Sequence, residues 1–318
     1  MIIQVCSKST VPPENRAPLR RQWYLNQNWH FLAFNASFIL VFIVPLTGLI
    51  QTSYRSDTFS YIPFIPFISA YLIYLNRQMV FSQKRSYSSA GLIPISIGIL
   101  VLFIAGKRTA SLDHFDYFSL VALSMVLIWI GGFTLCYGTK SLRAAAFPVL
   151  FLFLMVPIPT NVLDKFIFIL QTSSADAAYG FLKATGVPVA RDGFVFHLPT
   201  LNIEVAKECS GIRSALSLVI TGLLAGKLFL RTGWARTLLV IAIVPITILK
   251  NGFRIAVLSI LGVYVDERIL GSALHRNGGI LFFILALVLV WGVIVLLGKA
   301  EGSTNQGRIK KEEVIRDN

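Results

Sequence analysis

Three residues whose side chains can carry covalent and proton-transfer chemistry lie in the second half of the chain, each beside an apolar run. Cys209 stands where a polar stretch ends, Arg254 follows a later apolar run, and His275 precedes the last one. A thiolate is a nucleophile, a guanidinium is a permanent cation with a two-pronged set of donors, and an imidazole exchanges protons near neutral pH. If the three meet near one membrane surface, they suffice for nucleophilic catalysis.

The surroundings of Cys209 indicate an activated thiol. The sequence predicts that Cys209 begins a helix whose first turn is formed by residues 210–213, and a helix amino terminus carries about half a positive charge that favours a thiolate. Arg213 would add a full charge on the same helical face, whereas Glu208 opposes it. The alternative is a small packing residue, which is our interpretation of Cys136 inside an apolar run.

Arg254 lies just after an apolar run, in the sequence Asn251-Gly-Phe-Arg254. An ionisable group at the edge of a bilayer is costly, so its presence favours a functional role. An arginine there suits an oxyanion or a carboxylate, and Asn251 is a supporting candidate. The alternative is a side chain that extends to the lipid headgroups, which is what we expect of the neighbouring Lys250.

His275 is the candidate proton carrier, because it precedes the last apolar run by three residues. A thiol nucleophile needs such a group when the leaving group is an amine. His197, in the strand-like stretch that leads to Cys209, is the rival.

The bulk composition predicts a membrane protein. Of 318 residues 55% are hydrophobic and 14% charged, and the mean hydropathy is +0.70, which is more apolar material than a soluble core of this length buries. Eight apolar runs have lengths suited to spanning a bilayer, although some are interrupted by proline. They cover residues 31–50, 60–75, 90–106, 117–137, 144–159, 210–226, 237–251 and 278–298, and we expect the helix at 237–251 to continue outward.

The basic residues gather in the tails and in alternate short loops, which places both termini in the cytoplasm by the positive-inside rule. The formal charge of +14 is therefore explained by topology and needs no nucleic acid. The first thirty residues are polar and carry several arginines, so we expect a cytoplasmic tail and no cleaved signal peptide. Cys209 should then lie on the extracytoplasmic side of the membrane.

One outer segment, residues 160–208, does not have the composition of a span. It begins with an amphipathic helix, which predicts a segment lying along the membrane interface. From residue 187 apolar and polar side chains alternate around turn signals, so a small hairpin or three-stranded sheet should deliver the chain into Cys209. The expected fold is an all-α polytopic membrane protein of about eight helices with this helix and hairpin inserted. Three widely spaced cysteines predict neither a metal cluster nor a disulfide scaffold, and we expect no cofactor.

The second half of the chain resembles the exosortase/archaeosortase family of polytopic membrane transpeptidases. The resemblance rests on an ordered set of motifs: Pro157-Ile-Pro159, Gly186-Val-Pro-Val-Ala-Arg191, His197-Leu-Pro199, Glu208-Cys-Ser-Gly-Ile-Arg-Ser214, Asn251-Gly-Phe-Arg-Ile255 and His275-Arg-Asn-Gly-Gly279. By this resemblance the catalytic residues are Cys209, Arg254 and His275, and residues 31–298 form one membrane domain between cytoplasmic tails 1–30 and 299–318.

The resemblance also implies a substrate class. It is a secreted protein that ends in a short Pro-Glu-Pro-like sorting motif, a membrane helix and a basic cluster, and the cut protein passes to a cell-surface acceptor. Other partners would be membrane lipid and a separate exosortase-associated protein. Two alternatives stay open: an envelope glycan ligase or polymerase, which would not require Cys209, and a transporter or structural membrane subunit, which would place its ionisable residues at mid-bilayer.

Overall fold

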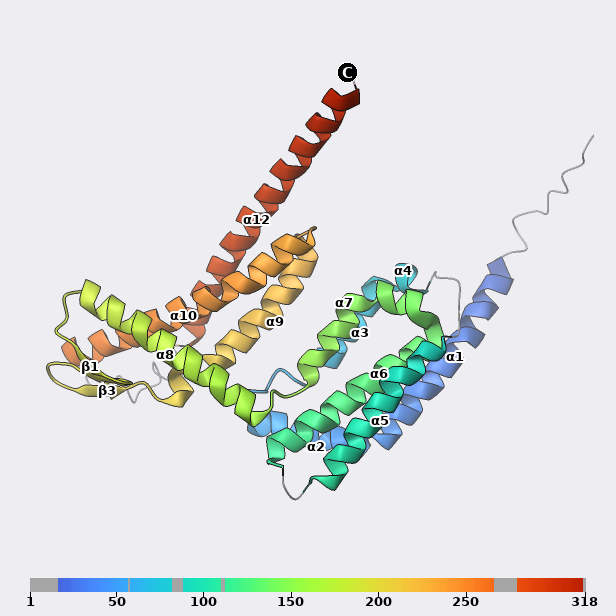
Figure 1. Ribbon diagram of the computed structural model, residues 1–318, viewed down its shortest axis with the longest axis horizontal. Helices are drawn as coiled ribbons and strands as arrows, with labels where there is room; N and C mark the ends of the chain where they lie inside the picture. The colour runs from blue at the N-terminus through green and yellow to red at the C-terminus, as the bar shows by residue number, and fades with distance from the viewer. Residues whose placement is uncertain (1–16, 57, 82–87, 110–111, 266–278, 317–318) are drawn as a thin grey trace, which may run out of the picture. The chain divides into compact units, whose positions relative to one another are not determined.

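The computed structural model describes residues 17–56, 58–81, 88–109, 112–265 and 279–316 (Figure 1). Contacts divide the chain into two compact units, which are taken separately below. The first comprises Met1–Ser56 and Ser60–Ile158, and the second Asp57–Phe59 and Pro159–Asn318. Every sequence-predicted site residue belongs to the second unit.

The first unit is built around α6, which packs against α5 and, more lightly, against α1 and α2. Its elements are α1 (Ala17–Val41), α2 (Ile43–Arg55), α3 (Phe64–Leu75), α4 (Arg77–Phe81), the 3₁₀ turn η2 (Ser89–Gly91), α5 (Leu92–Lys107), α6 (His114–Ala144), α7 (Ala146–Phe151) and the 3₁₀ turn η3 (Leu152–Met155). The glycine pair Gly91 and Gly131 lets η2 approach α6, since a Cβ on Gly131 would lie 2.6 Å from the carbonyl oxygen of Gly91.

Proline and glycine set the breaks in these helices. The first predicted span is bent by 66° between α1 and α2. Pro45 explains the bend, because it has no N–H for the carbonyl of Val41 and its ring clashes with that carbonyl. In α6 the backbone of Gly138 has φ 83°, which breaks the helix where the sequence predicts the end of the fourth span.

The second unit contains α8 (Thr160–Ala184), β1 (Ala190–Asp192), β2 (Val195–His197), β3 (Asn202–Glu204), the 3₁₀ turn η4 (Lys207–Ser210), α9 (Ile212–Phe229), α10 (Gly233–Tyr264) and α12 (Gly279–Arg316). Helix α10 is its centre, because α8, α9 and α12 all pack on it. The half of α10 that begins at Gly233 forms an apolar core with α9 and α12, made of Leu218, Leu230, Ala235, Leu239, Ile243, Ala286, Val290, Ile294 and Leu297.

The turn between α9 and α10 is tied to α12 by Glu301. Its carboxylate accepts hydrogen bonds from the backbone N–H groups of Arg231 (3.1 Å) and Thr232 (2.7 Å), and from the Thr232 hydroxyl. A carboxylate at the start of α10 suits the positive end of that helix. The three helices are therefore joined at the end that lies away from Cys209.

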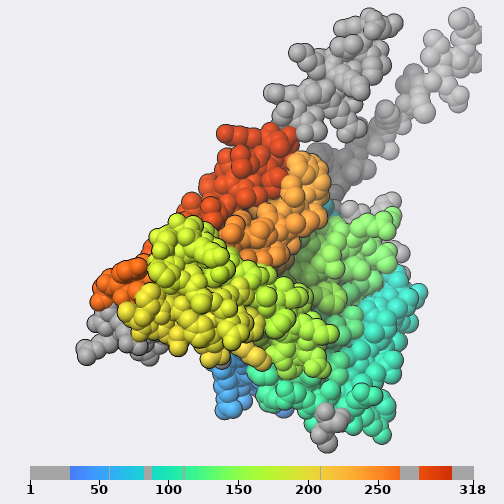
Figure 2. All heavy atoms as spheres, turned by 60° about the vertical axis from the view of Figure 1, so that its left-hand side comes forward, coloured from blue at the N-terminus to red at the C-terminus, as the bar shows by residue number. Residues whose placement is uncertain are grey.

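The predicted small sheet is present and has three strands. The strands are antiparallel in the order β1-β2-β3, with Phe196 opposite Arg191 on one side and Ile203 on the other. Phe196 is fully buried against Ala175 and Ala178 of α8. Figure 2 shows α8 and the strands gathered on one face of this unit.

The all-α membrane architecture is confirmed, although several predicted boundaries differ. Among the described residues five helices are long and apolar enough to cross a membrane, or up to seven if two bent helix pairs each count as one span. The predicted span 60–75 contains the 12-residue helix α3. The predicted span 144–159 contains only two short elements: α7, which includes Pro148, and η3, which ends two residues before Pro157. The predicted span 237–251 is part of the 32-residue α10.

Candidate active site

Cys209 lies in the 3₁₀ turn η4, three residues before the first residue of helix α9. The Cys209 N–H donates to the carbonyl of Ala206 (2.9 Å), which closes the turn. Gly211 follows with φ 79°, a left-handed conformation that favours glycine, and the helix begins at Ile212. The prediction that Cys209 begins the helix is therefore wrong, because this glycine turns the chain before the first helical residue.

This correction changes the expected electrostatics of the thiol. Arg213 is exposed and sits in α9, whereas Cys209 is outside it, so the two are not neighbours on one helical face. At the start of α9 the Ser210 hydroxyl accepts a long hydrogen bond from the N–H of Ile212 (3.4 Å), and Gly211 provides no side-chain cap. The predicted activation by the first turn of α9 therefore lacks the geometry on which it was based.

Asn251 holds the turn from α10. Its side chain is fully buried, and its Nδ2 donates to the Cys209 carbonyl at 2.7 Å. Its Oδ1 has no hydrogen-bond partner among the described residues. Gly211 packs against the same amide, because a Cβ at Gly211 would lie 3.1 Å from Asn251 Oδ1.

The sequence predicts that Lys250 extends to the lipid headgroups, and this prediction is wrong. Lys250 is 4% exposed, and its Nζ donates to the Ser214 hydroxyl at 2.6 Å. Ser214 in turn donates to the carbonyl of Gly211 at 2.9 Å. The prediction fails because α9 supplies a hydroxyl acceptor inside the protein, and no periodicity in the sequence pairs residues 214 and 250.

Gly252 allows α8 to approach α10 closely. A Cβ at this position would lie 2.6 Å from Ala177 Cβ and 3.0 Å from the backbone nitrogen of Ala178. Three consecutive residues of α10 thus meet three different neighbours: Lys250 meets α9, Asn251 meets η4, and Gly252 meets α8. They can do so because each residue turns about 100° around a helix.

Arg254 lies one turn further along α10 and is partly buried. Its neighbour Ile255 belongs to the same apolar cluster as Cys209, together with Phe196 and Val205. The fold therefore brings the Arg254 segment and the Cys209 turn to one small region of the molecule. Helix α10 continues through Arg254 to Tyr264, and in this way it carries the Arg254 segment past the Cys209 turn.

Gln171 of α8 is a further support that the sequence analysis did not identify. It is buried, and its Nε2 donates to the carbonyl of Val205 at 2.6 Å. The signal that could have revealed it is an amide on the side of α8 that carries Leu170 and Ala175 into the core. Gln171 fixes the chain just before η4, as Asn251 fixes it within η4.

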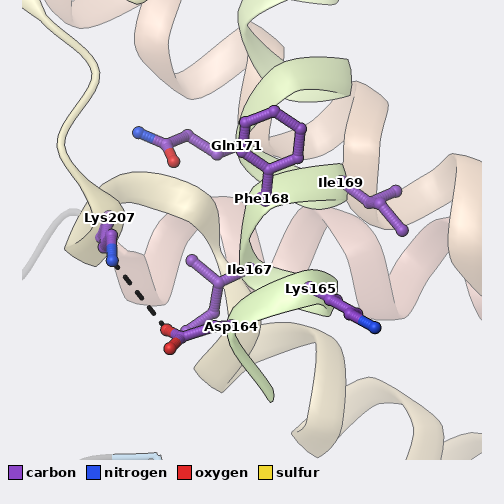
Figure 3. Close-up of a pocket in the computed structure, with 7 residues that line it drawn as sticks. All are labelled: Asp164, Lys165, Ile167, Phe168, Ile169, Gln171 and Lys207. Carbon is purple, nitrogen blue, oxygen red and sulfur yellow. Dashed lines mark ion pairs between the residues drawn. The ribbon is translucent and has the colours of Figure 1, made fainter. Parts of the chain in front are cut away.

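A groove of about 530 Å³ opens beside the Cys209 turn. Its lining comes from α8 and η4 and consists of Asp164, Lys165, Ile167, Phe168, Ile169, Gln171 and Lys207 (Figure 3). Lys207 Nζ lies 3.9 Å from Asp164 Oδ1, and both side chains are largely exposed. The groove is mostly apolar and starts two residues from Cys209, so it is suited to an extended segment with apolar side chains.

The two candidate histidines differ in what the structure describes. His197 is exposed, and its Nδ1 lies 2.9 Å from Asn202 Oδ1. Successive side chains of a strand point to opposite faces, and Phe196 is the one that faces the cluster containing Cys209. His197 therefore points away from that cluster. His275, and the side chain of Glu208, lie outside the described residues.

No group of three or more His, Cys, Asp or Glu residues in the described part of the chain could hold a metal ion. Around the Cys209 turn the described polar groups are the Cys209 thiol, the Arg254 guanidinium, the buried Lys250 amine, and the buried side-chain amides of Asn251 and Gln171.

Comparison with known proteins places this arrangement in a family. No curated protein and no solved structure matches the chain. The family model described as transmembrane exosortase (Exosortase_EpsH) matches residues 50–292, which include α8, the sheet, η4 and the whole of α10. The chain is a multi-pass membrane protein that belongs to the transmembrane exosortase family.

Proposed function

We propose that this protein is a cysteine-type peptidase and transpeptidase that cuts carboxy-terminal sorting signals from secreted proteins and passes the cut protein to a cell-surface acceptor. The observation that carries the proposal is the held turn of Cys209. Asn251 binds its carbonyl, and the Arg254 segment packs in the same cluster. Positions of this kind fix a nucleophile relative to a cation, as covalent catalysis requires.

The proposed reaction has two acyl transfers. The Cys209 thiolate attacks the scissile carbonyl and forms a tetrahedral intermediate, whose oxyanion Arg254 stabilises. The carbon–nitrogen bond breaks, His275 gives a proton to the departing amine, and a thioester remains on Cys209. An acceptor amine or other nucleophile then attacks the thioester carbonyl and gives its proton to His275, the carbon–sulfur bond breaks, and the thiolate leaves.

The membrane assists binding in this proposal. The substrate's own helix would pack among the spans, which fixes the depth of the cleavage site and removes much of the entropy cost of docking. The groove beside Lys207 would receive the residues on one side of the scissile bond, because it shares η4 with Cys209.

The experiment is to trap the thioester. The full chain is co-expressed with a secreted reporter that ends in a sorting motif, a membrane helix and a basic cluster. Expected results are an adduct that hydroxylamine releases, a modified peptide containing Cys209, and loss of both adduct and cleavage in Cys209→Ala. Cys136→Ser is the matched control, since this thiol lies in the other unit and should leave cleavage intact.

Two results would contradict the proposal. One is cleavage that persists at the wild-type rate in Cys209→Ala. The other is a defect in envelope glycan assembly in Arg254→Ala with normal assembly in Cys209→Ala, which would favour a glycan ligase or polymerase.

A further inference from the structure

A lysine amine buried inside α10 is the least expected polar group of this unit. Lys250 is 4% exposed and lies within a helix that is long and apolar enough to cross a membrane. Arg254, one turn further on, repels it electrostatically. Burying a cation beside a second cation costs free energy, and a well-packed apolar side chain of similar size is usually no less stable there. Stability alone therefore does not explain the residue.

The contacts of Lys250 lead to the Cys209 turn through one hydroxyl. Its Nζ donates to Ser214 Oγ at 2.6 Å, and Ser214 Oγ donates to the Gly211 carbonyl at 2.9 Å. A hydroxyl that accepts from a cation becomes a better donor, so the two bonds strengthen one another. Gly211 is the left-handed residue on which the direction of the chain after Cys209 depends.

Asn251 makes the complementary contact. Its Nδ2 reaches the carbonyl of Cys209 at 2.7 Å, two residues before Gly211. Two consecutive residues of α10 thus hold the backbone on both sides of Ser210. Asn251 bonds directly to the carbonyl before it, and Lys250 reaches the carbonyl after it through the Ser214 hydroxyl. Two separate attachments fix both the position and the orientation of the turn, which one attachment does not.

We propose that Lys250 and Ser214 act as a single positioning pair that locks the Cys209 turn against α10. The inference rests on the proposed function and deepens it by assigning two positioning residues to the nucleophile. Lys250 does not touch substrate in this proposal. It acts through Ser214 and Gly211, and an ammonium group at this position gives a charge-assisted bond to the hydroxyl, which is shorter and stronger than a neutral one.

The test uses the full chain with Cys6→Ser and Cys136→Ser, so that Cys209 is the remaining thiol. Variants Lys250→Met, Ser214→Ala and the double variant are compared for the alkylation rate of Cys209 by iodoacetamide and for reporter cleavage. Each single change should alter the alkylation rate by at least about threefold and slow cleavage by about 10-fold to 100-fold, because small misplacements of a reacting group are costly. The double variant should match Lys250→Met, since residues that act as a unit are not additive.

Thermal unfolding separates positioning from mere stability. Ser214→Ala should lower Tm because it leaves a buried amine without its acceptor, whereas Lys250→Met should keep or raise Tm while still slowing cleavage. Ser214→Thr retains the hydroxyl and should restore wild-type alkylation and cleavage. Ser259→Ala is the matched control, because that buried hydroxyl bonds within its own helix to Ile255 at 2.8 Å.

Wild-type alkylation rates in both single variants, or additive effects in the double variant, would overturn the pairing. If the loss of cleavage is proportional to the fall in Tm in all variants, Lys250 contributes only to stability and is not a positioning residue. These outcomes differ from failure of the proposed function, which shows as cleavage that survives Cys209→Ala whatever the alkylation rates are.

Discussion

At the scale of single residues, Cys209 is held by α10 through its backbone and does not stand at the start of a helix. The left-handed Gly211 separates the cysteine from α9, so the dipole of α9 is not directed at the thiol in the way the sequence predicts. Asn251 bonds directly to the turn, and Lys250 bonds to it through Ser214. A family motif in which glycine follows Cys-Ser therefore describes a turn that precedes the helix.

Replacing Gly211 with alanine should damage the site more than the fold. A left-handed alanine costs about 1–2 kcal/mol, and its Cβ would lie 3.0 Å from Asn251 Cγ, so the amide that binds the Cys209 carbonyl must move. We expect Gly211→Ala to slow reporter cleavage by at least about tenfold. Gly193→Ala is the control: that residue also has positive φ, at 58°, but no atoms surround the added Cβ.

Gly193→Ala should thus show a similar loss in Tm with cleavage retained. Equal cleavage losses in the two variants would mean that strain in the backbone, and not the contact with Asn251, explains the result at Gly211.

The two histidines should differ in their effect on cleavage. His197 is exposed, is bonded to Asn202 and lies on the face of β2 opposite Phe196, so His197→Ala should reduce cleavage less than about threefold. His275→Ala should slow it by about 10²-fold to 10⁴-fold if this residue is the proton carrier. Initial rates of reporter cleavage at equal protein levels decide the matter, and the reverse ranking would reassign the proton carrier to His197.

At the scale of elements, the site depends on how closely α8 approaches α10. Gly252 is the contact point, and α8 also holds Val205 through Gln171. In this way α8 supports the chain before Cys209, while α10 supports the turn itself. The same helix exposes Phe166, Phe168 and Ile169, which is consistent with the amphipathic pattern in the sequence.

Gly252→Ala should separate these two helices. The added methyl would lie 2.6 Å from Ala177 Cβ and 3.0 Å from a backbone nitrogen, neither of which belongs to a flexible side chain. We expect a loss of about 1–3 kcal/mol in the free energy of unfolding and slower cleavage. Gly180→Ala, on α8 in open space, should instead be neutral or stabilise by about 0.5–1 kcal/mol. Denaturant unfolding compares the two, and equal stabilities would rule out tight packing at Gly252.

The elements that could be predicted from the sequence are those with a periodic pattern of apolar residues or a distinctive composition. Apolar runs identified the membrane class, and alternation around residues 195–205 identified the small sheet, because both signals are local. The contact of Asn251 was not predictable, since it interrupts the apolar run but is buried and bonds to the Cys209 carbonyl. The Lys250–Ser214 bond joins residues far apart in sequence, and such pairs leave no periodic signal.

At the scale of the whole molecule, the length of α10 sets where the site lies in the membrane. About 20 residues separate Gly233 from Arg254, and at 1.5 Å per residue that distance is about 30 Å, close to the thickness of the hydrocarbon core. If the Gly233 end lies at one surface, then Arg254 lies near the other. The α8 and sheet cluster packs on residues 255–263, beyond that depth.

This geometry makes a topology prediction that single-cysteine reporters can test. In a chain whose native cysteines are serine, Thr200→Cys marks the exposed loop between β2 and β3, and Gly233→Cys marks the opposite end of α10, where an added side chain meets no atoms. In intact cells an impermeant maleimide should label residue 200 and not residue 233, whereas both should react after the membrane is opened. The natural Cys209, restored alone, should follow residue 200. Labelling of residue 233 but not of residue 200 in intact cells would place the thiol on the cytoplasmic side, where secreted substrates are not available after export, and the proposed peptidase could not act on them.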